Sequence, residues 1–377
     1  MKWIGILALT PWIVGCGEPP KPSDPALTIE LRWLKGFAQE DLSQVETGLL
    51  WTLSFLGATL PRETSDLLSW RGDTVTVRLD RAGIDSDALP HWERLLAVMK
   101  ASEEYYRMGA LDIGRFVALT LCSSRHYYAL TGAHVRYEEA RAKYAFDPRL
   151  VAIVESGVAQ GDRLLEVAQG TAFGDIAFIG HEGAGSVWQG TFRKEEHELL
   201  DVMPNGQLRF ALYGADGVLK PAAARALTAA GKPSKCLWCH ETHLLRPFAA
   251  RSSVAGYYPP SELEGQVASG MERLRRVRAS LRSKIDFARE QDHTYAELLY
   301  LAFYEPSAER LAREWNLPLD QVQQMLLGLP THAHGEFPFL GDKLYRRSQV
   351  DALAPYRVLD VPTDPREPST YEPDLLR

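Results

Sequence analysis

The pentapeptide Cys236-Leu237-Trp238-Cys239-His240 constrains the local fold more than any other feature of this 377-residue sequence. Two cysteines separated by two residues place both sulfur atoms on one side of a tight turn or of a helix start. The histidine directly after the second cysteine then lies close to any group that the two thiols bind. The chain must therefore present two thiols and one imidazole from a single short turn or helix.

Covalent attachment of a c-type haem explains all three reactive residues of this pattern. Attachment needs two thiols that reach the two vinyl groups of one porphyrin edge, and an imidazole that turns beneath the iron. We therefore expect one haem c, with thioether bonds from Cys236 and Cys239 and with His240 as the proximal iron ligand. Nearby apolar side chains would exclude water from the haem, namely Leu237, Trp238, Leu244 and Phe248.

The first sixteen residues, MKWIGILALTPWIVGC, resemble the signal peptide of a bacterial lipoprotein. Lys2 gives a positive start, and the apolar run that follows is too short to span a bilayer. The last four residues, IVGC, resemble a lipobox. That resemblance implies that residues 1–15 are removed and that Cys16 is acylated, so that membrane lipid holds the protein. A simple signal peptide with an incidental cysteine is the alternative.

The stretch after the cleavage point supports export and anchoring. Residues 16–27 contain four prolines and are typical of an extended tether. No aspartate follows Cys16. In Gram-negative lipoproteins this implies sorting to the outer membrane, with the protein at its periplasmic face. Export also brings the chain to the side of the inner membrane where haem c is attached.

The charge balance and the remaining motifs give little support to other functions. A net charge of −7 gives no reason to expect a nucleic-acid partner, so residues 308–325 are interpreted as a packed helical pair rather than a DNA-binding motif. No nucleophile elbow, phosphate-binding glycine loop or paired-carboxylate signature is found. Cys122 and His126 lie four residues apart and fit packing on a helix. An enzyme in which haem serves an N-terminal active site remains a third hypothesis.

The periodicity of apolar residues predicts an α+β chain that is mainly helical. Residues 28–147 have helical spacing, interrupted by one short strand over 74–79. Residues 148–220 contain short apolar runs and a Pro204-Asn205-Gly206 turn, which predict a small antiparallel sheet. Residues 221–350 return to helical spacing. Residues 351–377 are rich in proline and acidic residues and predict an irregular tail.

The layout of residues 221–350 is similar to that of a small monohaem cytochrome c domain. A short helix over 222–230 would precede the motif, and further helical segments follow it. The resemblance implies electron transfer with a redox partner protein, or a haem-based sensing role. The sequence departs from the family because the preceding helix lacks the usual glycine and aromatic pair, and because Pro247 comes early.

The sixth iron ligand is open in this interpretation. Methionine or histidine in that position gives a low-spin electron-transfer centre. Met271 is the first candidate and Met325 the second, although each lies on an apolar helical face where methionine usually fills the core. An iron with no sixth protein ligand is the other alternative. Three histidines in polar segments are further candidates, namely His293, His332 and His334.

Two other chemistries would use the same residues. Cys236, Cys239, His240 and His243 are all zinc-ligand types, and a distant half-site would come from the pair at 332 and 334. Four ligands within eight residues are cramped, however. The two thiols would otherwise form a disulfide, but their flanks lack a thioredoxin-like βαβ pattern. Either choice would make the chain a structural or partner-binding lipoprotein.

Overall fold

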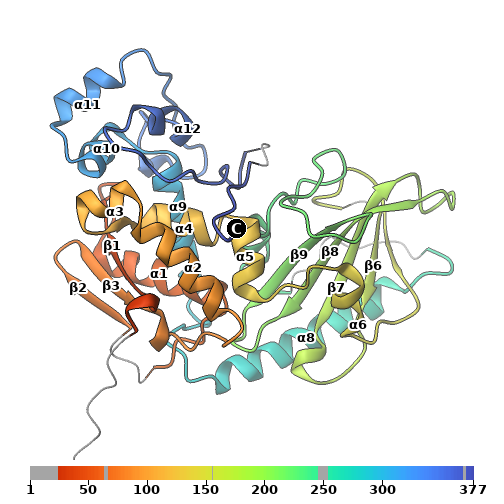
Figure 1. The fold of residues 1–377 in the computed structure, drawn as a ribbon. Coiled ribbons are helices and arrows are strands. Elements are labelled where there is room, and N and C mark those ends of the chain that lie inside the picture. Colours follow the sequence, from red (N-terminus) through yellow and green to blue (C-terminus); the bar gives the residue numbers. More distant parts are fainter. Residues whose placement is uncertain (1–23, 63–66, 155, 245–253, 368–370) are drawn as a thin grey trace, which may run out of the picture.

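The computed structural model describes residues 24–62, 67–154, 156–244, 254–367 and 371–377 (Figure 1). The predicted signal peptide and Cys16 lie outside the described residues. The fold is α+β, as predicted, with one four-stranded and one five-stranded sheet. None of the helices in the described ranges is both long and apolar enough to cross a bilayer.

The N-terminal part contains a small sheet that the sequence pattern only partly predicted. The pattern located the strand at 74–79, but it missed the three strands that pair around it. These strands have two to five residues, and so short a run cannot be told from a helical segment by its periodicity. The sheet has the order β2-β3-β1-β4 and consists of β1 (Thr28–Arg32), β2 (Leu68–Arg71), β3 (Thr74–Arg78) and β4 (Leu111–Asp112).

Six helices accompany this sheet, and four of them begin at a residue whose side chain caps the helix. Asp41 forms a capping box with Gln44 at the start of α1, and Asp112 caps α4. Residues 113–131 form two helices rather than one, because Ser123 accepts the His126 N–H and starts a new helix. The helices are α1 (Leu42–Phe55), α2 (Leu89–Lys100), α3 (Glu103–Met108), α4 (Ile113–Thr120), α5 (Ser124–Thr131) and α6 (Tyr137–Ala142).

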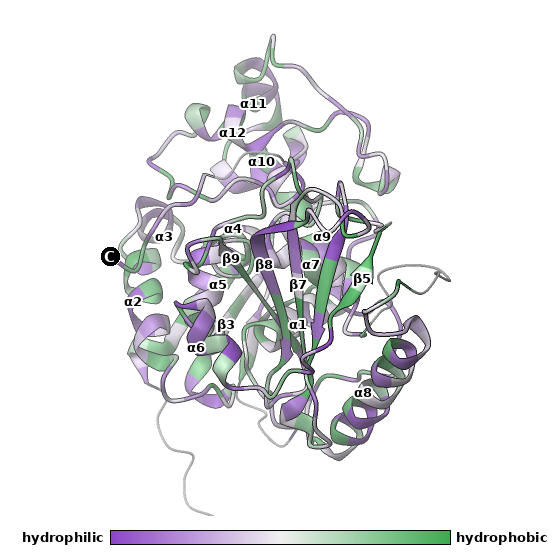
Figure 2. Ribbon diagram, turned by 90° about the vertical axis from the view of Figure 1, so that its right-hand side faces the viewer, coloured by the Kyte–Doolittle hydropathy of each residue, from purple (hydrophilic) through white to green (hydrophobic). Residues whose placement is uncertain are grey.

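The middle of the chain forms the predicted antiparallel sheet, a five-stranded meander in the order β5-β6-β7-β8-β9 (Figure 2). The predicted turn at 204–206 joins its last two strands, and Asn205 fixes this turn to the N-terminal part. Its buried side-chain amide donates to the carbonyls of Ser54 and Ala58 at 2.8 and 2.9 Å. The strands are β5 (Val151–Ile153), β6 (Arg163–Val167), β7 (Ala177–Ala184), β8 (Arg193–Val202) and β9 (Leu208–Gly214).

The segment between this sheet and the CxxCH motif is not the helix expected over 222–230. Its backbone pairs instead with the loop at 158–160, through Ala229 N–H to the Val158 carbonyl and Gln160 N–H to the Leu227 carbonyl. The Glu196 carboxylate also accepts the N–H of Ala224 at 2.9 Å. These contacts hold the alanine-rich stretch in turns, so tertiary contacts override its helix propensity.

The helices that follow the motif do not pack as one separate domain. Helix α9 packs between α1 and α4 in the N-terminal part, while α8 lies along the five-stranded sheet (Figures 1 and 2). Eight of the eleven residues of α9 are buried, so this helix needs neighbours on all sides. The helices are α7 (Pro233–His240), α8 (Pro260–Ser280), α9 (Thr294–Tyr304), α10 (Ala308–Trp315), α11 (Leu319–Met325) and α12 (Arg347–Val350).

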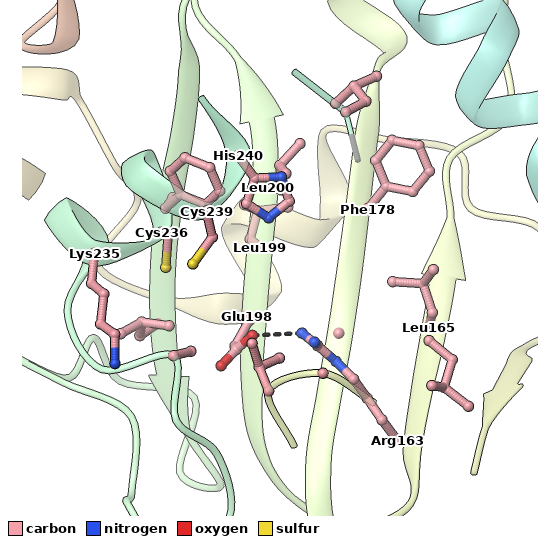
Figure 3. A pocket seen from close by; sticks show the side chains of 18 of the residues that line it. Arg163, Leu165, Phe178, Glu198, Leu199, Leu200, Lys235, Cys236, Cys239 and His240 are labelled. Carbon is pink, nitrogen blue, oxygen red and sulfur yellow. Dashed lines mark hydrogen bonds and ion pairs between the residues drawn. The ribbon is translucent and has the colours of Figure 1, made fainter. Parts of the chain in front are cut away.

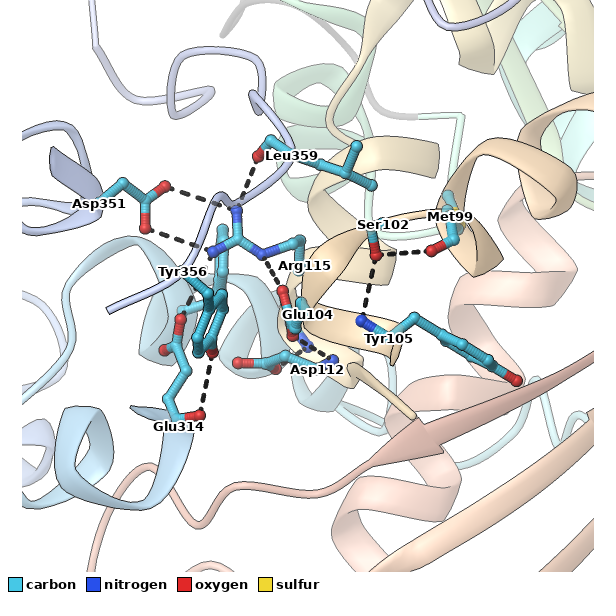
Figure 4. A network of polar contacts seen from close by, with 12 residues as sticks. Met99, Ser102, Glu104, Tyr105, Asp112, Arg115, Glu314, Asp351, Tyr356 and Leu359 are labelled. Atoms are coloured by element: carbon cyan, nitrogen blue, oxygen red, sulfur yellow. Dashed lines mark hydrogen bonds and ion pairs between the residues drawn. The ribbon is translucent and has the colours of Figure 1, made fainter. Parts of the chain in front are cut away.

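A buried network of charges joins α10, α12 and the residues just after α12 to the N-terminal part (Figure 4). The Arg115 side chain is fully buried and contacts Glu104 at 2.8 Å, Asp351 at 3.3 Å and the Leu359 carbonyl at 2.8 Å. Glu314, also fully buried, contacts Arg115 at 3.4 Å and accepts hydrogen bonds from two further arginines, Arg310 and Arg347. Because each charge has an opposite partner, the network tolerates burial that would otherwise be costly.

The close approach of α4 and α9 depends on a glycine. A Cβ atom on Gly114 would overlap the Cβ of Phe303 and lie 3.0 Å from the Leu299 carbonyl oxygen. We expect Gly114→Ala to lower the free energy of unfolding by about 1–3 kcal/mol through overpacking. Denaturant unfolding measures this loss. Gly265→Ala in α8 is the matched control, because nothing lies within 4 Å of its Cβ position. Equal stability of the two variants would contradict the proposed contact.

Candidate haem-binding site

The CxxCH motif forms the last five residues of the short helix α7. Pro233 lies in the first turn, where a backbone N–H would have no acceptor within the helix, so proline fits there. Glu241 ends the helix with a φ of 42°. Residues three and four apart share one face of a helix. Cys236, Cys239 and His240 therefore emerge on the same side of α7, which is the arrangement that the sequence predicted.

All three side chains line one pocket between α7, α8 and the five-stranded sheet (Figure 3). Its volume is about 340 Å³, within the range of about 300–1,000 Å³ that is usual for cofactor sites. Most of its walls are apolar, as a porphyrin face requires. The apolar side chains are Ile153, Val158, Leu165, Phe178, Leu199, Leu200, Phe210, Leu212, Leu244, Leu263 and Val267.

Of the four side chains expected to shield a haem, the structure places only Leu244 in the pocket wall. Leu237 and Trp238 lie on the other side of α7, where Trp238 stacks on Tyr300 with ring centroids 6.1 Å apart. Phe248 is outside the described residues. Most of the apolar side chains that line the pocket come instead from the five-stranded sheet, which lies outside the motif in the sequence.

The two thiols are free and in their neutral form. Burial raises the pKa of both Cys236 and Cys239 above the ordinary value of a thiol. Redox-active CxxC pairs depend on a lowered pKa, because the thiolate is the reactive species. The surroundings of this pair therefore do not favour the disulfide alternative.

The His240 imidazole has the properties of a metal ligand. Its ring lies against Phe210 at 5.1 Å, and burial lowers its pKa to about 4, so the ring is neutral at pH 7. Its Nδ1 atom lies 3.2 Å from the His243 carbonyl oxygen. When Nδ1 carries the proton and donates it to this carbonyl, Nε2 keeps a free lone pair for iron.

The pocket also has a polar wall that the sequence did not predict. Arg163 on β6 contacts Glu198 on β8 at 2.5 Å and Glu182 on β7 at 2.9 Å, and its side chain is 11% exposed. Arg163 and Glu198 line the pocket from strands β6 and β8, whereas the two cysteines line it from α7 (Figure 3). Burial raises the pKa of Glu182 to about 7. Gly180 makes room for Arg163, since a Cβ atom there would overlap the guanidinium group.

Neither of the methionines proposed as the sixth ligand lines the pocket. The Met271 side chain is buried, and its sulfur accepts the N–H of Leu244, in the turn that follows α7, at 3.0 Å. Met325 packs in the small apolar cluster of α10–α12. Among the described residues, His240 is the only histidine of the pocket wall and no methionine is part of it. The residues outside the described ranges contain no histidine, and their one methionine is Met1.

The three histidines from polar segments have other partners. His293 packs edge-on against Trp51, and His332 contacts Glu305 at 3.0 Å. His334 lies 3.1 Å from an Arg366 nitrogen. The structure thus brings Cys236, Cys239 and His240 together, and it does not bring any of the proposed sixth ligands to them.

The zinc alternative gains no support from the arrangement. The His243 Nδ1 atom lies 2.7 Å from the Glu241 carbonyl, and the histidines at 332 and 334 are engaged as described above. Within the described part of the chain, no three His, Cys, Asp or Glu side chains converge as a metal site requires.

The pair of Cys122 and His126 does not form an activated nucleophile. Cys122 is fully buried and burial raises its pKa, and both ring nitrogens of His126 contact backbone groups.

Comparisons with known proteins do not place this chain in a family. No family model, curated protein or solved structure matches it. The geometry of the pocket is therefore the basis for the functional proposal.

Proposed function

We propose that this protein binds one haem c covalently, through thioether bonds from Cys236 and Cys239 and with His240 as the proximal iron ligand. One observation carries the proposal, because all three side chains of the motif open onto the same apolar pocket. A bound haem would supply one-electron redox chemistry and an iron coordination site. The chain itself supplies the imidazole, the apolar walls that exclude water, and the Arg163–Glu198 ion pair on the sheet.

We further propose that the haem site binds a small exogenous ligand, which favours a sensing or redox role over simple electron transfer. The support is that His240 is the one imidazole of the described pocket wall and that no methionine faces it. Arg163 presents a fixed cationic donor to the pocket, held by Glu182 and Glu198.

The exogenous-ligand proposal predicts how the matured protein responds to added ligands. The ferrous protein will bind carbon monoxide and the ferric protein will bind cyanide, because no protein group has to leave the iron first. Absorption spectra and stopped-flow mixing measure both reactions. Met271→Leu and Met325→Leu will leave the oxidised and reduced spectra unchanged. A low-spin spectrum that either substitution converts to high spin would overturn the open sixth position.

Export and membrane attachment are also proposals, supported by the leader sequence. In a Gram-negative host, the wild-type protein will incorporate a labelled fatty acid and sediment with the outer membrane. Cys16→Ser will lose the label, because the acylated thiol is absent. Cys122→Ala is the control and will keep it. Label in the Cys16 variant, or an unlabelled wild-type chain, would contradict lipid anchoring at this residue.

A further inference from the structure

The C-terminal segment lies behind the helix that carries the CxxCH motif. Residues 359–367 and 371–377 contain no helix or strand, as the sequence predicted for this tail, yet several of their side chains are buried. This segment contacts α7 at two points. The pocket lies on the opposite side of the helix, so the tail and the proposed haem would hold α7 between them.

The first contact fixes the start of α7. Lys232 is the N-cap residue of this helix, and its side chain is 2% exposed. Its ammonium group donates to Glu372 at 2.6 Å and to the Thr363 carbonyl at 2.9 Å, so both partners belong to the C-terminal segment. Glu372 is equally buried and accepts the Ser123 hydroxyl at 2.9 Å, at the N-cap of α5. One buried ion pair therefore ties the starts of two helices to the tail.

The second contact lies within the motif itself. The Arg366 guanidinium stacks over the Trp238 ring at 4.5 Å. Its position is fixed by an ion pair with Glu297 on α9 and by another with Glu336 at 2.9 Å. Trp238 in turn stacks on Tyr300 of α9. The back of α7 is thus held against α9 by a residue of the tail.

We propose that Lys232, Glu372 and Arg366 are positioning residues that set the orientation of α7, and hence of His240, relative to the sheet. The effect on the haem rests on the proposed function, whereas the contacts themselves are present in the chain without haem. The backbone carbonyl of Lys232 accepts the N–H of Cys236 at 3.3 Å. A shift of the buried ammonium group therefore displaces the turn that presents the first thiol.

The test uses the full-length protein with Lys232→Met, Glu372→Gln, and the two combined. Backbone amide exchange over 233–241 will speed up about a hundredfold in each single variant, because one charge is left buried without its partner. The double variant will recover much of this protection, since no orphan charge remains. The ferric haem spectrum and the cyanide association rate will change in the single variants and return toward wild type in the double variant.

Arg346→Gln is the matched control. It removes an ion pair between Arg346 and Glu367 that also involves the tail, but these side chains are 50% and 32% exposed. This variant will leave amide exchange in α7 unchanged. Wild-type exchange in Lys232→Met and Glu372→Gln, or equal acceleration in the Arg346 control, would overturn the proposal. A wild-type chain that carries no haem would instead overturn the proposed function, while the exchange measurement on that haem-free chain would still decide the role of the tail.

Discussion

Replacing Cys236 and Cys239 together with alanine will abolish covalent haem attachment in cells that express the c-haem maturation machinery. The reason is chemical, because each thioether bond needs one of these sulfur atoms. A denaturing gel stained for haem peroxidase activity measures the result. Single substitutions will leave weaker staining, since one thioether can still form.

The control for this experiment is Cys122→Ala. Cys122 is fully buried in the N-terminal core and does not line the pocket. We expect this variant to stain like the wild type. Staining that persists in the double variant, or that is lost only with Cys122, would contradict the assignment of the two thiols.

Replacing Arg115 with methionine will lower the free energy of unfolding by about 3–5 kcal/mol, because the buried Glu104 carboxylate loses its cationic partner and the network around Glu314 and Asp351 loses one of its arginines. Arg115 is fully buried and contacts Glu104, Glu314 and Asp351 (Figure 4). Burial already raises the pKa of Glu104 to about 7, and without the arginine this carboxyl will be neutral over a wider pH range. Denaturant unfolding followed by circular dichroism measures the loss.

An exposed ion pair in the same region provides the comparison. Arg107 and Glu103 on α3 are 51% and 38% exposed, and their contact is 2.7 Å. Arg107→Met will cost no more than about 1 kcal/mol, because solvent screens an exposed pair. If the two substitutions cost the same, the buried network does not hold the C-terminal helices to the N-terminal part in the way we describe.

The reactive part of the site could be predicted because it is contiguous. Cys236, Cys239 and His240 occupy five consecutive residues, and their positions on one helix face follow from helical geometry alone. The pocket that they line could not be predicted in the same way. Arg163 and Glu198 are 35 positions apart and meet through the strand order of the sheet, which the local sequence does not specify.

Strand β6 shows why part of the sheet was missed. All five of its residues, Arg163 to Val167, are buried, so the strand has no alternation of apolar and polar positions. Its arginine and glutamate instead look like surface residues. The hairpin of β8 and β9 was predicted correctly, because a Pro-Asn-Gly turn separates two apolar runs.

Helix α9 shows a second limit of sequence reasoning. The helix begins at Thr294, and its mostly apolar composition indicates burial. That composition does not say which elements cover it. The resemblance to a cytochrome c layout grouped this helix with the motif, whereas the structure packs it between α1 and α4, where Gly48 and Gly114 allow close approach.

The most direct test of the central claim is the intact mass and absorption spectrum of the wild-type chain purified from cells with c-haem maturation. We predict one haem per chain that stays attached through denaturation and acidic organic extraction, with a pyridine haemochrome spectrum typical of two thioether bonds. A chain of unmodified mass with two titratable thiols in the motif would contradict the account, provided that a known c-type cytochrome matures in the same cells.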